Sequence, residues 1–393
     1  MENQKQPQFS RMSLNALMLV CIILIIILAG PGTGPDQLEL PDAPKINVNV
    51  WQSDSGARVW YSAHLSNSIE LQLWYQAGFR YDGQQKGSAN LLAQLLKYES
   101  KQLALPVKVA LDQDFIKIAL SLSSDPLVLK KQISSISKLI YHPRLSNNWL
   151  TQLRNGQQSL TDQLRMQAYG DHPYAGPRQG SPGSLHNITR SQIQGFHHLY
   201  LHPKRLFVSI VGDISEQTTQ VIIETLLPAS KHTKAKELLV NSHVSEQANT
   251  SNISVLVQPG IENFKIAQPK TLLANHYLIS QVLNQQQPNQ VKYQLGQLNN
   301  TFYIQGLAQV RKLLKQIEQG EFDWDMMLRA KRQLASKWLR QVQDAQKLSR
   351  YLVHLNAYDL PIDHMANNLT DLQEIDMDSW QQVSSQLLVA LNN

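Results

Sequence analysis

The chain has 393 residues and a formal net charge of +6, with 42% hydrophobic and 17% charged residues, a composition typical of folded proteins with about two domains. Its single cysteine, Cys21, excludes an intrachain disulfide and a zinc site built on cysteines. The positive charge is modest and forms no dense Lys/Arg patch with interleaved aromatic residues, so nucleic-acid binding has little support.

An apolar segment near the N-terminus predicts a membrane anchor. The run LNALMLVCIILIIILAG carries no charge, and at about 1.5 Å per residue it nearly crosses a hydrocarbon core about 30 Å thick. Lys5 and Arg11 precede it and acidic residues follow, so the positive-inside rule predicts residues 1–12 in the cytoplasm and 13–31 as a transmembrane helix. A cleaved signal peptide is the alternative, although ILAGPGTGP is a poor cleavage site. We expect a single-pass protein of a bacterial inner membrane, with its lobes in the periplasm.

Strands and helices follow a tether at 32–44. INVNVW and ARVWYSA are expected strands joined by the turn QSDSG, and IELQLWYQAG alternates apolar residues as a half-buried strand does. GSANLLAQLLKYESKQLAL predicts a helix, DFIKIALSLSS a strand, and DPLVLKKQISSISKLIYHP a helix that begins at Asp125–Pro126. Further helices are expected near 147–167 and 190–201, and RLFVSIVGD closes a first α+β lobe at 45–228.

A polar stretch at 229–252 is typical of an interdomain linker. Beyond it the order partly repeats, with a strand ISVLVQ, a helix TLLANHYLISQVLNQ and a strand TFYIQGL. Helices are then expected near 308–319 and 324–356, with a last one after Asp376. The chain therefore predicts two α+β lobes, the second at 253–393.

The run YGDHPYAGPRQGSPGSLHNITRSQIQGFHHLYLHPKRLFVSIVGDIS resembles the first lobe of the insulinase/pitrilysin-like zinc peptidases (inverzincins), the family of mitochondrial processing peptidase. There an HPY-type loop, a glycine turn, an I-T helix start, a Y-x-x-P turn and a closing GDI strand recur in this order. GARVWY, AGFRYDGQQKGSANLL and LRAKRQLASKWLRQ also look like their counterparts, so the resemblance covers roughly 45–385. It implies a LuxS/peptidase-like α+β fold of two homologous lobes, each an antiparallel sheet packed with helices, with the second lobe reduced.

The resemblance also points to a lost metal site. In the family, the helix that matches GSANLLAQLL carries H-x-x-E-H, whose two histidines bind zinc and whose glutamate activates a bound water. These positions align with Asn90, Ala93 and Gln94, which share one helical face. Carboxamides are poor zinc ligands, and alanine accepts no proton. The family's third ligand is a downstream glutamate, but no Glu occurs between Glu99 and Glu216. The resemblance thus implies a degenerate member without zinc, cofactor or catalytic residues.

The second lobe of active members supplies an Arg and a Tyr that hold substrate. This chain has no Arg between Arg205 and Arg311. Tyr293 is the candidate for the tyrosine and therefore for peptide binding, in a segment, VKYQLGQLNNTFY, that is short for the strands expected around it.

Other side chains could form a site, but each has a simpler interpretation. His198 and His202 lie i, i+4 in FHHLYLHP, next to His197, at a helix end where histidine commonly caps or packs. His172 is expected in a structural turn. The carboxylates that could be a replacement acid site lack a histidine partner at helical spacing and are expected to be solvated: Asp112, Asp114 and Asp171.

These observations favour a catalytically inactive, membrane-anchored peptidase homologue. As the resemblance implies, its role would be that of the non-catalytic subunit of a heterodimer with a zinc-bearing homologue, in peptide or protein processing. The first alternative is a stand-alone membrane-anchored binding or scaffold protein that only keeps the fold. The second is an active zinc-dependent endopeptidase, against which the missing ligands argue.

Overall fold

The computed structural model divides the chain into two compact units, Met1–Leu40 and Pro41–Asn393, and the description below concerns the second. The residues that the structure describes are 39–103, 106–144, 166, 172–227, 255–258, 261–266, 279–282, 291–294, 296–297, 300–304 and 307–392. None of the helices in these ranges is long and apolar enough to cross a membrane. The anchor expected at 13–31, the linker expected at 229–252 and nearly all of the helix expected near 147–167 lie outside them.

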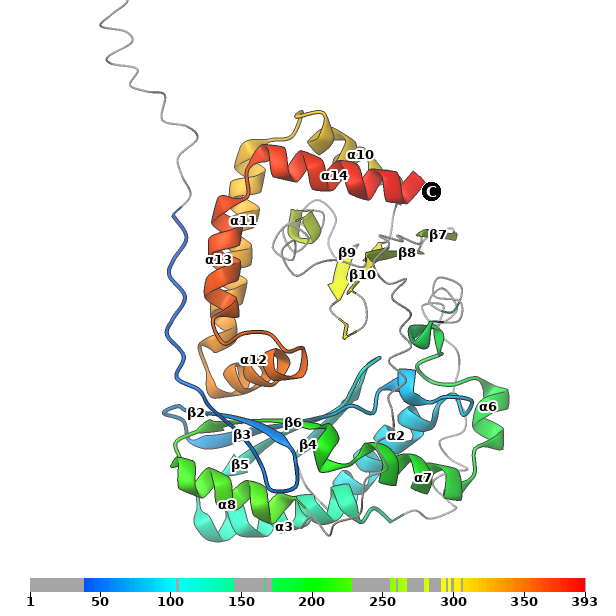
Figure 1. Cartoon of the computed structure of the whole chain (residues 1–393), viewed down its shortest axis with the longest axis vertical. Helices are drawn as coiled ribbons and strands as arrows, with labels where there is room; N and C mark the ends of the chain where they lie inside the picture. Colours follow the sequence, from blue (N-terminus) through cyan, green and yellow to red (C-terminus); the bar gives the residue numbers. More distant parts are fainter. Residues whose placement is uncertain are drawn as a thin grey trace, which may run out of the picture. The chain divides into compact units, whose positions relative to one another are not determined.

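A six-stranded sheet in the order β1-β2-β6-β3-β5-β4 forms the centre of the N-terminal half (Figure 1). Its strands are β1 (Asn49–Gln52), β2 (Arg58–Ala63), β3 (Ser68–Tyr75), β4 (Val107–Leu111), β5 (Ile116–Ser123) and β6 (Leu206–Gly212). All neighbours pair antiparallel except β2 and β6, which run parallel. The expected antiparallel sheet is therefore mixed, because β6 enters between β2 and β3 after a long connection, and only long connections allow parallel pairing.

Helices pack on one face of this sheet (Figure 1) and share its apolar core. They are α2 (Ser88–Gln102), α3 (Pro126–Tyr141), α7 (Arg190–Tyr200) and α8 (Glu216–Leu226). Asp125 caps α3, as its position before Pro126 predicts: its Oδ1 accepts the backbone N–H groups of Leu127 and Val128 at 3.0 and 2.9 Å. The short elements between them are η1 (Phe79–Tyr81), η2 (Pro173–Ala175), α6 (Pro182–Asn187) and η3 (Pro203–Arg205).

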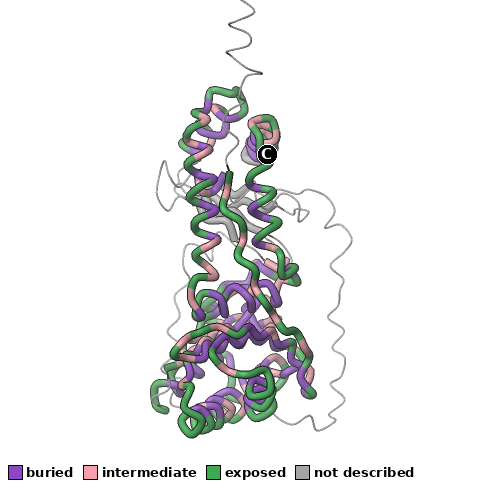
Figure 2. The backbone as a smooth tube through the Cα atoms, turned by 90° about the vertical axis from the view of Figure 1, so that its left-hand side faces the viewer, coloured by how far each residue is buried: buried purple, intermediate pink, exposed green. Residues whose placement is uncertain are grey.

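The helix α12 (Ala345–Ala357) contacts β2, β3 and β6 of the same sheet. Ser209 on β6 donates its hydroxyl to the Ser349 carbonyl at 2.6 Å, and the Asn356 amide donates to the Arg58 carbonyl at 3.1 Å. All residues of β6 are buried, as expected of a strand covered on both faces. Figure 2 shows the buried residues gathered around this sheet and the helices packed on it.

A second, antiparallel sheet of four strands has the order β7-β8-β10-β9. Its strands are β7 (Val255–Gln258), β8 (Ile261–Ile266), β9 (Val291–Gln294) and β10 (Asn300–Ile304). The helices beyond it are α10 (Leu307–Glu318), α11 (Trp324–Leu339), α13 (His364–Glu374) and α14 (Met377–Asn392), with η6 (Arg340–Val342) after α11. The single helix expected at 324–356 is thus two, α11 and α12, because Asp344 begins a new helix by accepting the Lys347 N–H at 2.7 Å.

Candidate functional site

The helix predicted from GSANLLAQLL is α2, and its start is tightly built. Gly87 adopts φ of +105°, and a Cβ there would lie 2.6 Å from Leu185 Cδ2, so the position requires glycine. The Asp82 carboxylate accepts the N–H groups of Gly87 and Ala89 at 2.7 and 2.8 Å. Burial raises the pKa of Asp82 to about 7, although the two N–H groups act in the opposite direction. Asp82 therefore fixes the start of the helix that carries the aligned motif.

The two sides of α2 differ. The leucine side is fully buried in the core and consists of Leu91, Leu92, Leu95 and Leu96. On the other side Asn90 and Gln94 are half-buried, while Ala93 between them is buried. The Asn90 amide lies 3.4 Å from the Gln179 carbonyl, a long hydrogen bond. The helix thus brings the three aligned positions together on one face, as their spacing predicts.

These side chains do not fit zinc. Asn90 and Gln94 offer neutral amides instead of imidazole nitrogens, and the Ala93 methyl group can neither bind metal nor take a proton. Within the described ranges, no group of three or more His, Cys, Asp or Glu residues could hold a metal ion. No reaction step through zinc can be derived from this face.

Tyr293, the candidate peptide-binding residue, lies on β9 at the position paired with Phe302 of β10. It therefore belongs to the second sheet, whereas the aligned motif positions belong to α2 beside the first sheet. A role for Tyr293 in peptide binding stays a prediction.

The histidines singled out in the sequence form structural contacts. His197 is buried, and its Nε2 lies 2.7 Å from the Ile140 carbonyl, to which the neutral ring donates. Burial lowers the pKa of His197 and favours this neutral form. The Nδ1 atoms of His202 and His172 accept backbone N–H groups two residues ahead, at 3.2 and 3.1 Å. These contacts agree with the capping and packing roles expected for them.

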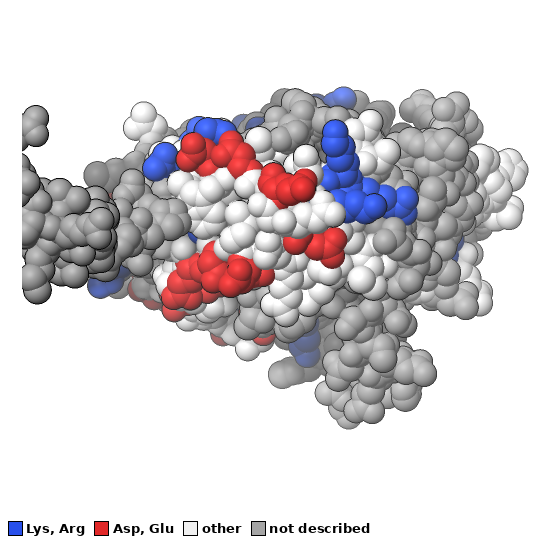
Figure 3. Space-filling model, turned by 90° about the horizontal axis from the view of Figure 1, so that it is seen from above, with Lys and Arg blue, Asp and Glu red and all other residues white. Residues whose placement is uncertain are grey.

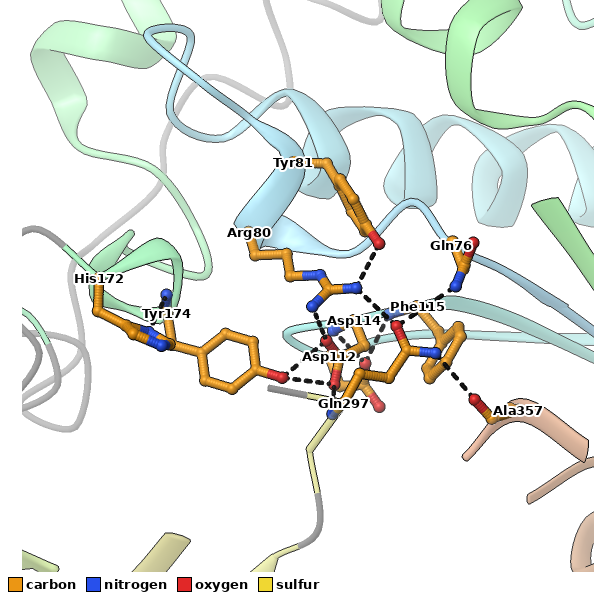
Figure 4. A network of polar contacts seen from close by, with 10 residues as sticks. All are labelled: Gln76, Arg80, Tyr81, Asp112, Asp114, Phe115, His172, Tyr174, Gln297 and Ala357. Atoms are coloured by element: carbon orange, nitrogen blue, oxygen red, sulfur yellow. Dashed lines mark hydrogen bonds and ion pairs between the residues drawn. The ribbon is translucent and has the colours of Figure 1, made fainter. Parts of the chain in front are cut away.

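A buried network of polar contacts lies beside η1 (Figure 4). Arg80 forms an ion pair with Asp114 at 3.1 Å. The Tyr174 hydroxyl donates to the same carboxylate at 2.8 Å, and the Gln297 N–H donates to it at 3.0 Å. Arg80 also donates to the Gln297 side chain at 2.6 Å, which in turn donates to the Ala357 carbonyl at 2.8 Å. The network ties the segment before α2 to the end of α12.

The expectation that the Asp carboxylates are solvated is wrong for Asp114, which has no exposed surface. Burial raises its pKa, and the charge of Arg80 lowers it. Asp112 is paired with Lys117 at 2.6 Å, and Asp171 lies outside the described residues. Because every oxygen of the Asp114 carboxylate has donors and water does not reach it, the network is a structural joint and not a replacement acid site.

Comparisons with known proteins agree with this geometry. Residues 187–298 match the family described as Peptidase M16 inactive domain. The fold resembles a peptidase M16 inactive domain from Pseudomonas fluorescens (TM-score 0.70, 16% identity), with coverage of 86% of this chain and 94% of that chain. It also resembles a protease from Helicobacter pylori (TM-score 0.66, 16% identity), with coverage of 87% and 97%.

A longer relative in fold is the periplasmic protease PqqL from Escherichia coli, with a TM-score of 0.65 and 14% identity. The match covers 88% of this chain and 47% of that chain, so this chain spans about half of PqqL. No curated protein matches the chain. The structures establish a shared M16-like α+β fold, and the family match adds the sequence signal. The resemblance to the insulinase-like M16 peptidases is therefore confirmed: residues 187–298 match the inactive domain of that family, the fold is M16-like, and the sequence has no H-x-x-E-H motif.

Proposed function

We propose that this chain is a non-catalytic M16 homologue that pairs with a zinc-bearing homologue in peptide or protein processing. The observation that carries the proposal is the state of α2. The helix keeps its glycine start, its Asp82 cap and its buried leucine side, but Asn90, Ala93 and Gln94 occupy the places of the ligands and the base. A helix that keeps its shape without its chemistry supports a role in forming a chamber or holding peptide.

The relatives in fold support a paired state. This chain spans 47% of PqqL, and a solved first half of PqqL matches over 90% of this chain and 91% of that half. A longer M16 chain thus has room for two units of this size. We propose that here the two units are separate chains, only one of which holds zinc.

The proposal includes the membrane. The apolar run at 13–31, with basic residues before it and acidic residues after it, supports a single inner-membrane helix with the folded part in the periplasm. PqqL, whose fold is similar, is a periplasmic protease. An anchored subunit would hold its partner at the membrane surface.

A mixing experiment tests the pairing. Peptide cleavage is measured for the full chain, for a zinc-bearing M16 homologue from the same organism, and for the two together, with and without chelator. We expect no cleavage by this chain alone, and co-elution with faster, chelator-sensitive cleavage in the mixture. The variant Asn90→Ala/Gln94→Ala is the matched control and should stimulate equally, because this face supplies no chemistry. Cleavage by the chain alone would indicate an active peptidase, and a mixture without co-elution or stimulation would favour the stand-alone binding or scaffold protein.

A further inference from the structure

A cavity of about 920 Å³ lies between the first sheet and the helices α11, α12 and α13. It forms because α12 covers β2, β6 and β3 but does not extend over β5 and β4. Its volume is in the range of sites that bind small molecules or short peptide segments. None of the three aligned motif positions on α2 lines it, so the cavity is separate from the lost zinc site.

The sheet wall of the cavity combines lysines with small residues. Strand pairing sets Lys108 opposite Ala119, and Lys117 opposite Ala110, on β4 and β5. All four side chains line the cavity, because they lie on the same face of the two strands. Directly paired Cβ atoms are about 5 Å apart, so each alanine leaves space beside a lysine. The Lys117 ammonium group lies 3.8 Å from the centre of the Trp74 ring, which lines the same wall.

The helical wall adds cations from two elements. Lys347, Arg350, Tyr351 and His354 line the cavity from α12, where spacings of three, four and seven place them on one stripe. The end of α11 contributes Lys337 and Trp338 to the lining, and η6 contributes Arg340. The cations therefore lie on several walls of the cavity and do not converge on one point.

In the described part of the chain, carboxylates balance only two of these cations. Among the described residues that line the cavity, six are Lys or Arg and none is Asp or Glu. Lys117 pairs with Asp112, and Lys347 pairs with Asp344, each at 2.6 Å. Within the described part of the chain, four cations that line the cavity make no ion pair and have largely exposed side chains: Lys108, Lys337, Arg340 and Arg350.

A further acidic group, Glu70, lies in a small adjoining pocket, where it accepts the hydroxyls of Ser68 and Ser121 at 2.8 Å. Some of the exposed carboxylates lie near the α10–α11 and α13–α14 junctions: Glu318, Glu321, Asp323, Glu374, Asp376 and Asp378. Figure 3 shows groups of acidic side chains, with Lys and Arg beside them, on the face seen from above. Because most of the cations in the described lining have no acidic partner, an anion is attracted to the cavity.

His354 lies in the same positively charged environment. Burial, followed by the charges of Lys117 and His364, lowers its pKa to about 3. The ring is therefore neutral at physiological pH and adds an aromatic surface instead of a further cation. It packs edge-on against Trp74, with 6.1 Å between the ring centroids.

We infer that this cavity binds an acidic peptide segment whose carboxylates pair with the cations on β4, α11, η6 and α12. The inference rests on the proposed function, because a non-catalytic M16 homologue would hold peptides instead of cutting them. Cations spread over several walls match an extended ligand with several negative charges, whereas one phosphate would need them to converge. Trp74, Trp338 and Tyr351 offer apolar surfaces on which the stems of Glu side chains can pack.

Binding of labelled peptides to the purified full chain tests the inference. The probe is a fluorescein-labelled octapeptide in which Glu alternates with Ser, and its control has Gln in place of Glu. Fluorescence polarisation should show at least about tenfold tighter binding of the Glu peptide, weakened by raising NaCl because surface charges are screened. The variant Lys108→Gln/Arg350→Gln should bind it about tenfold more weakly. The matched control Lys130→Gln/Lys131→Gln removes two exposed lysines from α3 and should change binding less than twofold.

Equal binding of the Glu and Gln peptides, or equal binding by the two variants, would overturn the inference. Inorganic pyrophosphate is the second probe: if it binds and the Glu peptide does not, the cavity is a site for phosphate compounds and the peptide assignment is wrong. These outcomes are independent of pairing, because the assay contains no partner. The cavity variant should still co-elute with the zinc-bearing homologue, so a failure of pairing shows up only in the mixing experiment.

Discussion

Arg80 and Asp114 form an ion pair that water barely reaches, since their side chains are 9% and 0% exposed. Removing two charges from water is costly, and only further hydrogen bonds make such a pair stable. Tyr174 and Gln297 supply them from segments 60 and 183 residues away from Asp114. These distant contacts explain why the burial of Asp114 could not be predicted from the sequence around it.

The variant Asp114→Asn tests this pair. It leaves the Arg80 charge buried without a counterion, so the free energy of unfolding should fall by about 3–5 kcal/mol. The control is Asp359→Asn, which removes an exposed partner 4.0 Å from Arg58 and should change stability by less than about 1 kcal/mol. Urea unfolding followed by tryptophan fluorescence measures both. Equal losses in the two variants would show that the buried pair does not stabilise the fold.

Asp82 gives the fold a pH dependence. Burial raises its folded pKa to about 7, above the unfolded value of about 3.9. Its contribution to stability is therefore fully present below about pH 4 and is lost as the pH rises through 7. The stability advantage of the wild type over Asp82→Asn should shrink between pH 4 and pH 7.5, by up to about 4 kcal/mol. Urea unfolding at each pH checks this, and an advantage that stays constant or grows would contradict it.

The three positions aligned with the zinc motif were more accessible to sequence reasoning than the buried pair. Asn90, Ala93 and Gln94 lie within one helical turn, so spacing alone places them on one face, and α2 has that helix. The cations of the cavity were missed because they come from elements separated by more than 200 residues. The spacing of Lys347, Arg350 and His354 on one stripe of α12 is the signal that could have indicated a charged wall.

At the scale of elements, strong hydrophobic periodicity predicted most of the helices and strands of the first lobe. Elements with weak local signals were missed. The helices α2, α3 and α7 and the strands β2, β3, β5 and β6 lie where the apolar patterns predict them. The strand β4 and the helices α6, α8 and α13 were not predicted. VKVAL is short, and α13 begins at Asp363 without a side-chain cap, so neither has a clear start signal. The parallel pairing of β2 and β6 depends on long-range order that local patterns do not contain.

Restoring the motif on α2 tests whether the rest of the active site has also been lost. The triple variant Asn90→His, Ala93→Glu and Gln94→His should not cleave peptides on its own, even with added zinc. The downstream glutamate ligand stays absent, since no Glu occurs between Glu99 and Glu216, and an incomplete ligand set holds zinc weakly. A misplacement of about 1 Å alone can cost about 100-fold in rate. Circular dichroism should confirm that the triple variant folds. Chelator-sensitive cleavage by this variant would show that the rest of the active site is still present.

At the scale of the whole molecule, a reporter fused after Asn393 tests the proposed topology. Alkaline phosphatase, which is active only when exported, should be active in this fusion, whereas a reporter that requires the cytoplasm should be inactive. The segment at 13–31 should also stay on the mature chain, as N-terminal sequencing can show. Inactive phosphatase would contradict a periplasmic location, and a mature chain that begins after Gly30 would contradict the anchor while leaving export intact.

The central claim is the proposal that this M16-like chain is non-catalytic because the face of α2 cannot hold zinc. The most direct measurement is the zinc content of the purified full chain after dialysis, by mass spectrometry, with a zinc-bearing M16 homologue treated in parallel. Because Asn90, Ala93 and Gln94 replace both ligands and the base, we predict far less than one zinc ion per chain, against about one in the homologue. About one tightly held zinc ion per chain would contradict the account.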